Sequence, residues 1–415
     1  MKLVLLGAGG MGRYTAHAAA TFDFVDELVI ADLDEAAARD LARSVGAKAR
    51  GVRVDVTQPA SLDAALHGVD AVLNTVGPFY RLGPPVLEAA IRNRVHYLDL
   101  NDDWESTEAM LAYDDDAREA GVTAIIGVGA SPGVTNLLAV CAARRLDVVT
   151  AIHPGFDLDA AMPETRGAAP SAATIHGVHQ LTGTIRVFDN GRIHDARPMA
   201  PVTLQFPGLG SARTWTMGHP EAITLPRAFP GLERCLVVMT MPPAHLAAMR
   251  VIRRLVDAGM LSLETAASWI ERLEGVGRHA ARTPADYLRE LAVERSRALP
   301  PLFAVAHGQR DGAPAWVAAT LTSAPTTGMG GATGVPLAVG VAAARDILGK
   351  RTGVFAPEAV LDPTTFLDLL APLCTPARRS AAELLIVTES WQPADLRADL
   401  ARLMRQDAAA GTNPA

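Results

Sequence analysis

Two histidines in the middle of the chain are the first candidates for chemistry. The stretch TIHGVHQLTG places His176 and His179 three residues apart, on one face of an expected helix. Histidine is the usual proton carrier near neutral pH, and such a pair can also bind a metal. No carboxylate or thiol lies within easy local reach, so we expect no metal. Polar residues of a cleft, or plain surface or core histidines, are the alternatives.

A second polar stretch, GHPEAITLPR, brings His219, Glu221 and Arg227 together in sequence. His219 could exchange a proton, and Glu221 could contact a substrate. Arg227 could bind a substrate carboxylate through two parallel hydrogen bonds. The alternative is an ion pair that fixes a loop. No G-x-S-x-G motif and no P-loop lysine occur, so hydrolase and kinase activities lack their residues.

The glycine-rich stretch GAGGMG lies between an apolar run and an alanine-rich, helix-favouring segment at the start of the chain. It satisfies G-x-G-x-x-G with Gly7, Gly9 and Gly12. Gly7 permits a tight turn, Gly9 lets the backbone approach a pyrophosphate, and Gly12 lets helix and strand pack closely. The N–H groups of this loop lie at the positive end of the helix dipole. The motif in this setting predicts a dinucleotide site.

Acidic residues at the ends of the next two strands bear on the choice of cofactor. Asp32 ends the stretch VIAD, where a carboxylate accepts hydrogen bonds from the adenosine ribose. A 2′-phosphate would face this carboxylate, and no Arg or Lys follows before Arg39, so we expect NAD(H) rather than NADP(H). Asp55 could face the adenine or cap a turn.

Loops after the later strands would complete the site. In NTVGPFYRLG, the Phe79 and Tyr80 rings could wall the nicotinamide or substrate, or one ring could pack in the core. Asp99, in VHYLDL, could hold a substrate ammonium group or anchor a loop. Ser131, in GASPG, either caps a helix or faces the cofactor. The residues expected to contact the cofactor are Gly7, Gly9, Gly10, Met11, Gly12, Asp32, Asp55, Val76, Gly77, Pro78, Phe79, Ser131 and Pro132.

Composition narrows the class of protein. A chain of 415 residues with 49% apolar and 20% charged residues is suited to two globular domains. The net charge of −7 and the absence of a Lys/Arg block argue against nucleic acid and anionic membranes as partners. The three cysteines are far apart, which fits a reducing cytoplasm. No signal-peptide pattern or long apolar stretch occurs, so no membrane span is expected.

The elements that must position these residues follow from hydrophobic patterning. In the first 145 residues, short β-rich runs alternate with helical patterns, which predicts an α/β fold with an N-terminal Rossmann, doubly wound parallel sheet. Hairpin and helix patterns then predict a second, α+β mixed-sheet substrate domain. The glycine-rich TTGMGGATG and the helix after it indicate a return to the first domain. We expect a nucleotide-binding domain over 1–135 and 325–370, a substrate and dimerisation domain over 136–324, and a C-terminal helical segment and tail over 371–415.

Several motifs together resemble the saccharopine dehydrogenase-like family of NAD(P)-dependent oxidoreductases, which includes saccharopine reductases, carboxynorspermidine dehydrogenases and lysine 6-dehydrogenases. They are GAGGMG, NTVGPFYRLGPPVLEAAIRNRVHYLDLND, GASPGVTNLLA, GHPEAITLPR and GGATGVPLAVG with GVFAPE. The resemblance runs from residue 1 to about 370. Many relatives continue with Gly-Glu after H-Y-x-D, whereas this chain has Asn101, Asp102 and Asp103, in a loop that the resemblance places beside the substrate.

The resemblance implies hydride transfer at a C–N bond of an amino acid, imine or opine-like secondary amine, in a cleft between the two domains. It implies no metal. We expect a cytoplasmic homodimer that uses NAD, with NADP second. A carbonyl or hydroxy-acid reductase and a non-catalytic NAD(H)-binding sensor or scaffold are the alternatives. The candidate catalytic residues are Asp99, His179 and His219, and the candidate substrate-binding residues are Tyr80, Asp102, His176, Glu221 and Arg227.

Overall fold

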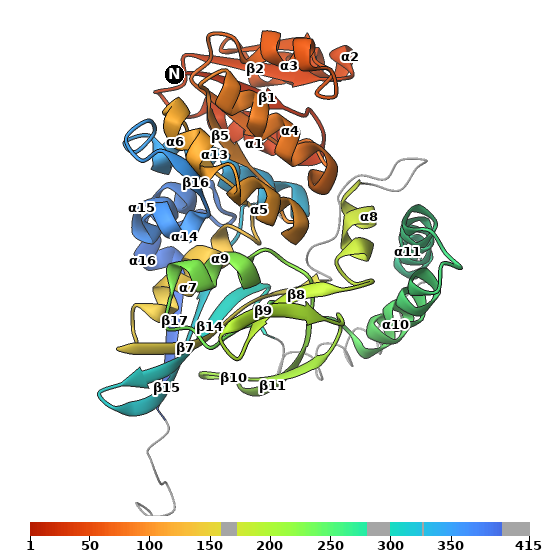
Figure 1. Cartoon of the computed structure of the whole chain (residues 1–415), viewed down its shortest axis with the longest axis vertical. Helices are drawn as coiled ribbons and strands as arrows, with labels where there is room; N and C mark the ends of the chain where they lie inside the picture. Colours follow the sequence, from red (N-terminus) through yellow and green to blue (C-terminus); the bar gives the residue numbers. More distant parts are fainter. Residues whose placement is uncertain (159–171, 280–298, 326–327, 392–415) are drawn as a thin grey trace, which may run out of the picture.

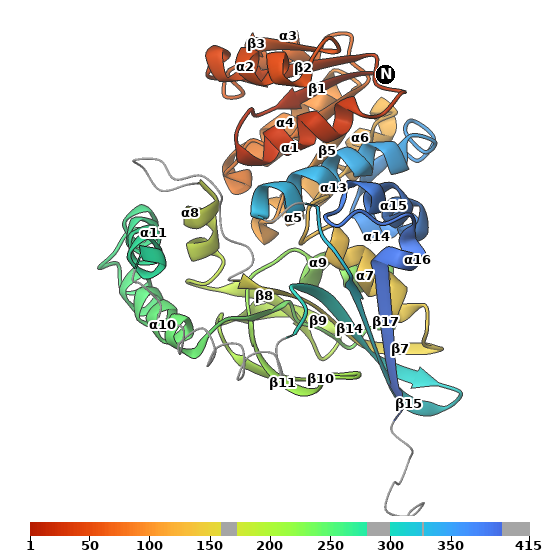
Figure 2. The ribbon, with the colours of Figure 1, turned by 180° about the vertical axis from the view of Figure 1, so that it is seen from behind.

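The computed structural model describes residues 1–158, 172–279, 299–325 and 328–391. Two sheets lie one above the other along the long axis of the molecule, each with its own helices (Figures 1 and 2). Because the chain crosses from the first sheet to the second and back, residues far apart in sequence meet between them.

The first sheet has seven parallel strands in the order β16-β6-β5-β4-β1-β2-β3. The order reverses between β1 and β4, which is the point where doubly wound sheets bind ligands at the carboxyl ends of their strands. The strands are β1 (Lys2–Leu6), β2 (Glu27–Asp32), β3 (Ala49–Arg53), β4 (Ala71–Asn74), β5 (His96–Asp99), β6 (Thr123–Ile125) and β16 (Gly353–Phe355).

Helices cover both faces of this sheet, as the sequence of β1 requires. Leu3 and Leu5 pack into one core and Val4 and Leu6 into the other, and all four are fully buried. Successive side chains of a strand point to opposite faces, so a continuous apolar run needs cover on both. The helices are α1 (Gly10–Ala20), α2 (Glu35–Val45), α3 (Pro59–Leu66), α4 (Phe79–Arg92), α5 (Trp104–Leu111), α6 (Asp114–Ala120), α7 (Val134–Ala143) and α13 (Met329–Ala344).

Helix α13 packs closely along α1 although more than 300 residues separate them. A Cβ on Gly334 would lie 2.3 Å from the carbonyl oxygen of Met11, so only glycine allows this approach. The Thr15 hydroxyl donates to the Gly334 carbonyl at 2.8 Å. β16 then pairs with β6, which returns the chain to the first sheet.

The second sheet is mixed and ten-stranded, in the order β10-β11-β13-β7-β12-β8-β9, with β14 paired to β7, β15 to β14 and β17 to β15. Its turns match the sequence: Asn190 and Gly191, both with positive φ, connect the β8–β9 hairpin. The strands are β7 (Val148–Asp157), β8 (Ile185–Asp189), β9 (Arg192–Ala196), β10 (Pro201–Phe206), β11 (Gly210–Thr216), β12 (Arg234–Cys235), β13 (Val238–Thr240), β14 (Leu302–Arg310), β15 (Ala313–Leu321) and β17 (Leu385–Trp391).

Helix α7 joins the two sheets into one hydrophobic core. Leu137 and Leu138 are fully buried, and they belong to the same core cluster as Leu98 of β5 and Ala304 of β14. The two domains are therefore packed together at α7, and helices attached to the second sheet meet the first domain elsewhere. The helices of the second domain are α8 (Ala172–His179), α9 (Glu221–Ala228), α10 (Pro243–Asp257) and α11 (Leu263–His279). Of these, α8 and α9 contact the first domain, and α8, α10 and α11 form a lobe at one side (Figure 1).

The C-terminal part of the described chain differs from the helical segment expected for it. Short helices are α14 (Pro357–Val360), α15 (Pro363–Leu370) and α16 (Ala381–Leu384), with a 3-10 turn at Ala371–Leu373. The chain then forms β17 as an edge of the second sheet, paired with β15. The β-branched run Ile386–Thr388 explains the strand, because such residues favour sheets.

Candidate functional site

The glycine loop after β1 has the geometry of a dinucleotide site. Gly7 has φ of +100°. A Cβ on Gly12 would lie 2.0 Å from the Gly7 carbonyl oxygen, so Gly12 allows the helix to start against the strand. Gly9 caps α1, while Gly10, Met11 and Gly12 form its first turn with N–H groups that have no intrahelical acceptor.

The space around Gly9 fits a bound pyrophosphate. A Cβ built on Gly9 meets no atom within 4 Å, so the backbone there borders open space. The same holds for Gly77, which follows β4 across the point where the strand order reverses. An anion between these loops could approach the peptide N–H groups closely, because neither glycine has a side chain in the way.

Replacing Gly9 with alanine is expected to weaken binding of the nicotinamide cofactor at least about tenfold, or about 1.4 kcal/mol. The new methyl group would occupy the space of the pyrophosphate without touching the protein, so the thermal stability should not change. Calorimetric titration with the reduced cofactor measures the effect, and Gly231→Ala, on an exposed loop, is the matched control. Unchanged affinity in Gly9→Ala would exclude the loop as the pyrophosphate site.

Asp32 lies at the end of β2 beside the glycine loop. Its Oδ2 accepts the Ala8 N–H at 2.7 Å and its Oδ1 accepts the Asp34 N–H at 2.9 Å. These bonds fix the carboxylate next to the loop, where the adenosine ribose of a bound cofactor is expected. Asp34 caps α2 by accepting from Ala36 and Ala37.

Other residues expected at the cofactor have structural partners. Asp55 accepts the N–H and hydroxyl of Thr57, which lower its pKa, so it caps the turn after β3. Phe79 is buried and belongs to the same core cluster as residues of α1 and α13, as in the core-packing alternative. Val76 donates its N–H to the Asn74 side chain, and Pro78 caps α4, so this loop is held in place at the carboxyl edge of β4.

Asp99 does not point into a cleft, which corrects the orientation we expected for a catalytic residue. It is fully buried, and its Oδ1 accepts the N–H groups of Gly127 and Asn101 at 2.7 and 3.0 Å. Its Oδ2 accepts the Tyr97 hydroxyl at 2.7 Å, which in turn accepts from Asn74 at 3.1 Å. Burial raises the pKa of Asp99 to about 7. Asp99 thus ties together the loops after β4, β5 and β6.

Deleting the Tyr97 hydroxyl is expected to lower the free energy of unfolding by about 1–3 kcal/mol, because Tyr97→Phe leaves two buried polar groups without a partner. The ring would remain in place, so cofactor affinity should change little. Urea unfolding compares this variant with Tyr113→Phe, which changes a partly buried tyrosine outside the network. Equal stability of the two variants would mean that the network contributes nothing to the fold.

A network of hydrogen bonds between the two domains surrounds Glu221. Its Oε1 accepts from Ser131 at 2.6 Å and from Thr135 at 2.9 Å, and its Oε2 lies 2.8 Å from His219 Nδ1. Burial opposes ionisation of Glu221, but the charge of His219 and the hydrogen bonds from His219 and Ser131 lower its pKa. The ionised carboxylate can only accept, so His219 donates through Nδ1. Among the described residues, no hydrogen bond to Nε2 of His219 is found, and the side chain is only 3% exposed.

This network differs from the sequence-based expectation for the Ser131 loop. Ser131 does not cap α7, because its hydroxyl donates to Glu221 and the helix instead begins at Gly133. Pro132 is buried with its ring where a Cβ on Gly127 would lie, so it shapes the loop without facing open space. Sequence reasoning missed Thr135 and also Asn136, which donates to Glu358 at 2.8 Å. The quoted motifs GASPGVTNLLA and GVFAPE contain both partners of that bond.

A second cluster joins α8 to the loop before α5. Asp103 Oδ1 lies 2.9 Å from His176 Nδ1 and 3.8 Å from His179 Nδ1. Asp102 Oδ2 lies 3.0 Å from His176 Nε2. Tyr80 covers this side, with its ring centroid 5.4 Å from that of His179. Four expected substrate-site residues or their neighbours therefore lie close together here: Tyr80, Asp102, His176 and His179. Asp103, which the sequence analysis named as part of the loop but not as a candidate, contacts both histidines.

The ionisation of this cluster follows from its burial and its carboxylates. Burial opposes protonation of His176, but Asp102 and Asp103 outweigh it and raise the pKa of His176 to about 10. Burial also opposes ionisation of Asp103, but His176 and His179 lower its pKa overall. We expected no carboxylate near the histidine pair, because none lies close to it in sequence. The fold instead places the Asp103 carboxylate beside both histidines.

Arg227 lies apart from both clusters. It is exposed near the end of α9, whereas Glu221 at the start of that helix is fully buried. The structure thus separates the arginine from the two residues with which it was grouped. His96, at the first residue of β5, accepts the Thr123 N–H through Nδ1 at 3.1 Å and is half-buried.

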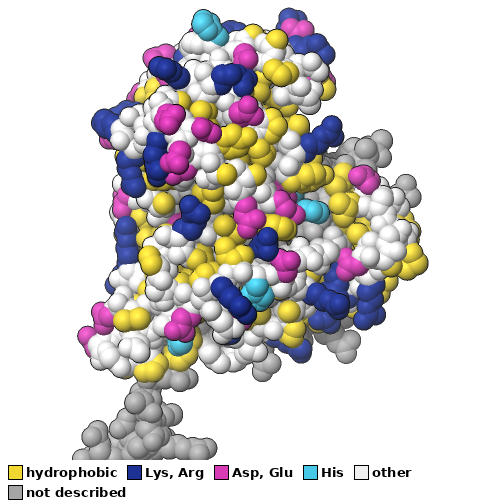
Figure 3. Space-filling model, in the orientation of Figure 1, with side chains coloured by type: hydrophobic (Ala, Val, Ile, Leu, Met, Phe, Trp, Pro, Cys, Tyr) yellow, Lys and Arg dark blue, Asp and Glu magenta, His cyan; other side chains and the backbone are white. Residues whose placement is uncertain are grey.

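On the face shown in Figure 3, Lys and Arg side chains are interspersed with Asp and Glu. In the part of the chain that the structure describes, no helix combines the length and apolar character needed to cross a membrane. Cys141, Cys235 and Cys374 are all free thiols.

Comparison with known proteins finds one family model that matches the N-terminal part of the chain and relatives that match about 60% of it. Residues 3–125 match the family model described as the saccharopine dehydrogenase NADP binding domain. A carboxyaminopropylagmatine dehydrogenase from Synechocystis sp. is 24% identical over 269 residues, which cover 60% of this chain and 65% of that protein. A carboxynorspermidine synthase from Vibrio alginolyticus is 26% identical over 288 residues, covering 63% of this chain and 67% of that protein.

A solved structure extends the similarity of fold to nearly the whole chain. The apo saccharopine dehydrogenase (L-Glu forming) from Saccharomyces cerevisiae superposes with a TM-score of 0.60 at 15% identity, covering 94% of this chain and all of that one. This likeness confirms the predicted fold class, a doubly wound parallel sheet with a second mixed-sheet domain.

Proposed function

We propose that the protein is an NAD(P)-dependent oxidoreductase that acts at a C–N bond, and the match of residues 3–125 to the saccharopine dehydrogenase NADP binding domain supports this proposal. Its substrate is an amino acid, an imine or an opine-like secondary amine. Two matched relatives are named for secondary amines, a carboxyaminopropylagmatine dehydrogenase and a carboxynorspermidine synthase, and these names support this class. The single observation that carries the proposal is the His219–Glu221–Ser131 network, which brings a proton carrier beside the carboxyl edge of the parallel sheet.

In this proposal His219 is the catalytic acid and base. As an amine is oxidised, Nε2 of His219 takes the proton that leaves the substrate nitrogen, and it returns that proton when an imine is reduced. A nicotinamide cofactor held by the glycine loop would supply or take up the hydride at the carbon next to that nitrogen. Glu221 stabilises the imidazolium through Nδ1, and Ser131 and Thr135 hold the carboxylate in place. Glu221 is thus a positioning residue.

The glycine loop and Asp32 would bind the cofactor. We infer NAD(H) as the preferred form, because the Asp32 carboxylate is held where the ribose 2′ position is expected. The loops that Asp99 ties together would support the nicotinamide end. His176, His179, Tyr80 and Asp102 line the contact between α8 and the first domain, where we place one wall of the substrate cleft.

A panel of substrates tests the proposal. The protein with NAD⁺ should oxidise at least one amino acid or secondary amine, and the formation of reduced nicotinamide reports it. Matching hydroxy acids should remain unreacted. Turnover of a hydroxy acid alone would instead assign a carbonyl or hydroxy-acid reductase. Micromolar cofactor binding without turnover of any class would assign a sensor.

We also propose a cytoplasmic homodimer. The free cysteines fit a reducing compartment. Val251, Met260 and Trp269 are exposed apolar residues on the α10–α11 side of the lobe, which fits an interface with a second chain. Light scattering during size-exclusion chromatography would give the mass of a dimer, and the mass of one chain would contradict it.

A further inference from the structure

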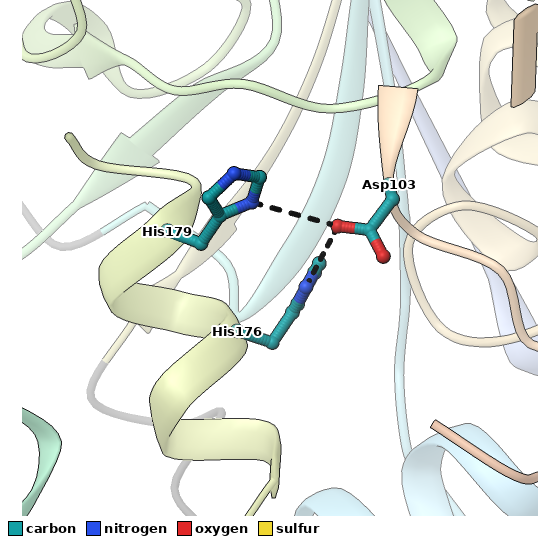
Figure 4. Close-up of side chains that lie close together, drawn as sticks. All are labelled: Asp103, His176 and His179. Carbon is teal, nitrogen blue, oxygen red and sulfur yellow. Dashed lines mark ion pairs between the residues drawn. The ribbon is translucent and has the colours of Figure 1, made fainter. Parts of the chain in front are cut away.

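The cluster between α8 and the loop before α5 carries an inference that is independent of the proposed reaction. We propose that Asp103, His176 and His179 form a binding site for one divalent transition-metal ion of the zinc class. The ion would join α8 of the second domain to the first domain. Figure 4 shows the Asp103 carboxylate directed between the two imidazole rings, which stand on one side of α8.

The spacing of the three donor atoms suits a small tetrahedral ion. All three lie within 4.8 Å of one another. Zinc binds nitrogen and oxygen at about 2.0–2.2 Å, so two ligands of a tetrahedral ion lie about 3.4 Å apart. The distances from Asp103 Oδ1 to the Nδ1 atoms of His176 and His179, 2.9 and 3.8 Å, bracket that value. Small adjustments of two side chains would therefore complete the geometry.

Asp103 Oδ1 lacks a hydrogen-bond partner among the described residues, although it is buried. Its contact with His176 is short, but the ring N–H is not aligned for a hydrogen bond. Its two contacts with the imidazoles are ion pairs without an aligned hydrogen bond, and a coordinated cation would give this buried oxygen a directed ligand bond. The other oxygen, Oδ2, accepts the Tyr80 N–H at 2.8 Å and so fixes the direction in which Oδ1 points.

Each imidazole has a carboxylate on its outer side, as metal-binding histidines usually do. Asp102 Oδ2 lies 3.0 Å from His176 Nε2, and Glu105 Oε1 lies 3.6 Å from His179 Nε2. In both rings Nδ1 is turned toward Asp103 and Nε2 toward a second carboxylate. The contact of His176 Nε2 with Asp102 is short without being an aligned hydrogen bond, and both rings present Nδ1 to the same carboxylate oxygen, the side from which a metal would be bound.

The charge and exposure of the cluster also suit a cation. Asp102, Asp103 and Glu105 bring three negative charges beside two histidines, and a divalent ion would offset two of them. The His179 side chain is 30% exposed, so an ion can enter from solvent. Nitrogen donors favour zinc-class ions over Mg²⁺ and Ca²⁺, which prefer oxygen ligands. The alternative is a metal-free ion pair in which protonated His176 bridges the two aspartates.

Calorimetric titration of the chelator-treated full-length protein with ZnCl₂ tests the proposal. We expect one ion per chain with micromolar or tighter affinity, no binding of Mg²⁺, and a higher melting temperature with zinc. His179→Gln should weaken zinc binding at least tenfold, because it removes a ligand but keeps the His176–Asp103 pair that holds α8. Asp102→Asn should weaken it about 10–100-fold through the orientation of His176.

His67→Gln, which removes an exposed histidine from the end of α3, is the matched control and should bind zinc like the unmodified protein. Two results would overturn the site: no saturable zinc binding to the unmodified protein, or the same affinity in His179→Gln. Either would leave the metal-free ion pair as the account of the cluster. The melting temperature without zinc shows whether each variant is folded.

Discussion

Replacing His219 with glutamine is expected to lower kcat for the amine substrate by roughly 10²–10⁴-fold, the range that a positioned acid–base group contributes. Glutamine can still donate to Glu221, so the interdomain network and the fold should remain, but it cannot carry a proton from the substrate. KM should change little, because the lost step is proton transfer in the transition state and not binding. Cofactor affinity should also be unchanged, because the glycine loop is not altered.

The companion variant Glu221→Gln separates positioning from catalysis. It replaces the charged acceptor that holds the Nδ1–H of His219 with a neutral amide, so the imidazole is less firmly oriented and kcat should fall while cofactor affinity stays the same. The loss in kcat should be smaller than for His219→Gln. Glu264→Gln, which changes an exposed carboxylate at the start of α11, is the matched control. A His219→Gln enzyme with kcat within about threefold of the unmodified value would remove His219 from the mechanism.

Exchanging Asp32 for serine and Leu33 for arginine is expected to reverse or abolish a roughly hundredfold preference for NAD(H). The 2′-phosphate of NADP(H) carries a charge of about −1.5 to −2, and the Asp32 carboxylate is fixed beside its expected position by two backbone N–H groups. A clash of like charges costing roughly 2–3 kcal/mol corresponds to that preference. Leu33 is 58% exposed, so an arginine there would stay in solvent and reach the phosphate.

The ratio of kcat/KM for the two cofactors with one substrate measures this preference. Calorimetric affinities give the same ratio if the substrate is not yet known. Asp40→Ser, an exposed carboxylate further along α2, is the control and should leave the ratio unchanged. Equal or better use of NADP(H) by the unmodified protein would show that Asp32 does not face the ribose.

The hydrophobic pattern of the sequence predicted most strands and helices of the nucleotide-binding domain, because each of these elements depends mainly on residues that are close together in sequence. The apolar run before Gly7 and the helix after Gly12 are one strand–turn–helix unit, and the structure has it as β1 and α1. Phe79 and Tyr80 show the limit of such reading. Both follow β4, yet Phe79 is buried in the core and Tyr80 faces His179, because adjacent residues at the start of a helix point in different directions.

The contacts that make the candidate site join residues far apart in sequence, and spacing does not predict them. Ser131 meets Glu221 across 90 residues, and Asp103 meets His176 only because α8 returns to the first domain. The sequence itself contains the evidence that the side chains of Arg227 and Glu221 lie on different faces of one helix. Six residues at 100° each place the two side chains about 120° apart around a helix, so they cannot share one face. Recognising α9 in the sequence would have shown this.

The fate of the hydride tests the central claim most directly. Cofactor carrying deuterium at the transferred position should be incubated with the protein, an amine and an oxo compound, and the product analysed by mass spectrometry and NMR. The account predicts a secondary amine with one deuterium on the carbon bonded to nitrogen, formed only when both amine and oxo compound are present. Deuterium on a carbon that bears a hydroxyl group, formed from the oxo compound alone, would contradict it.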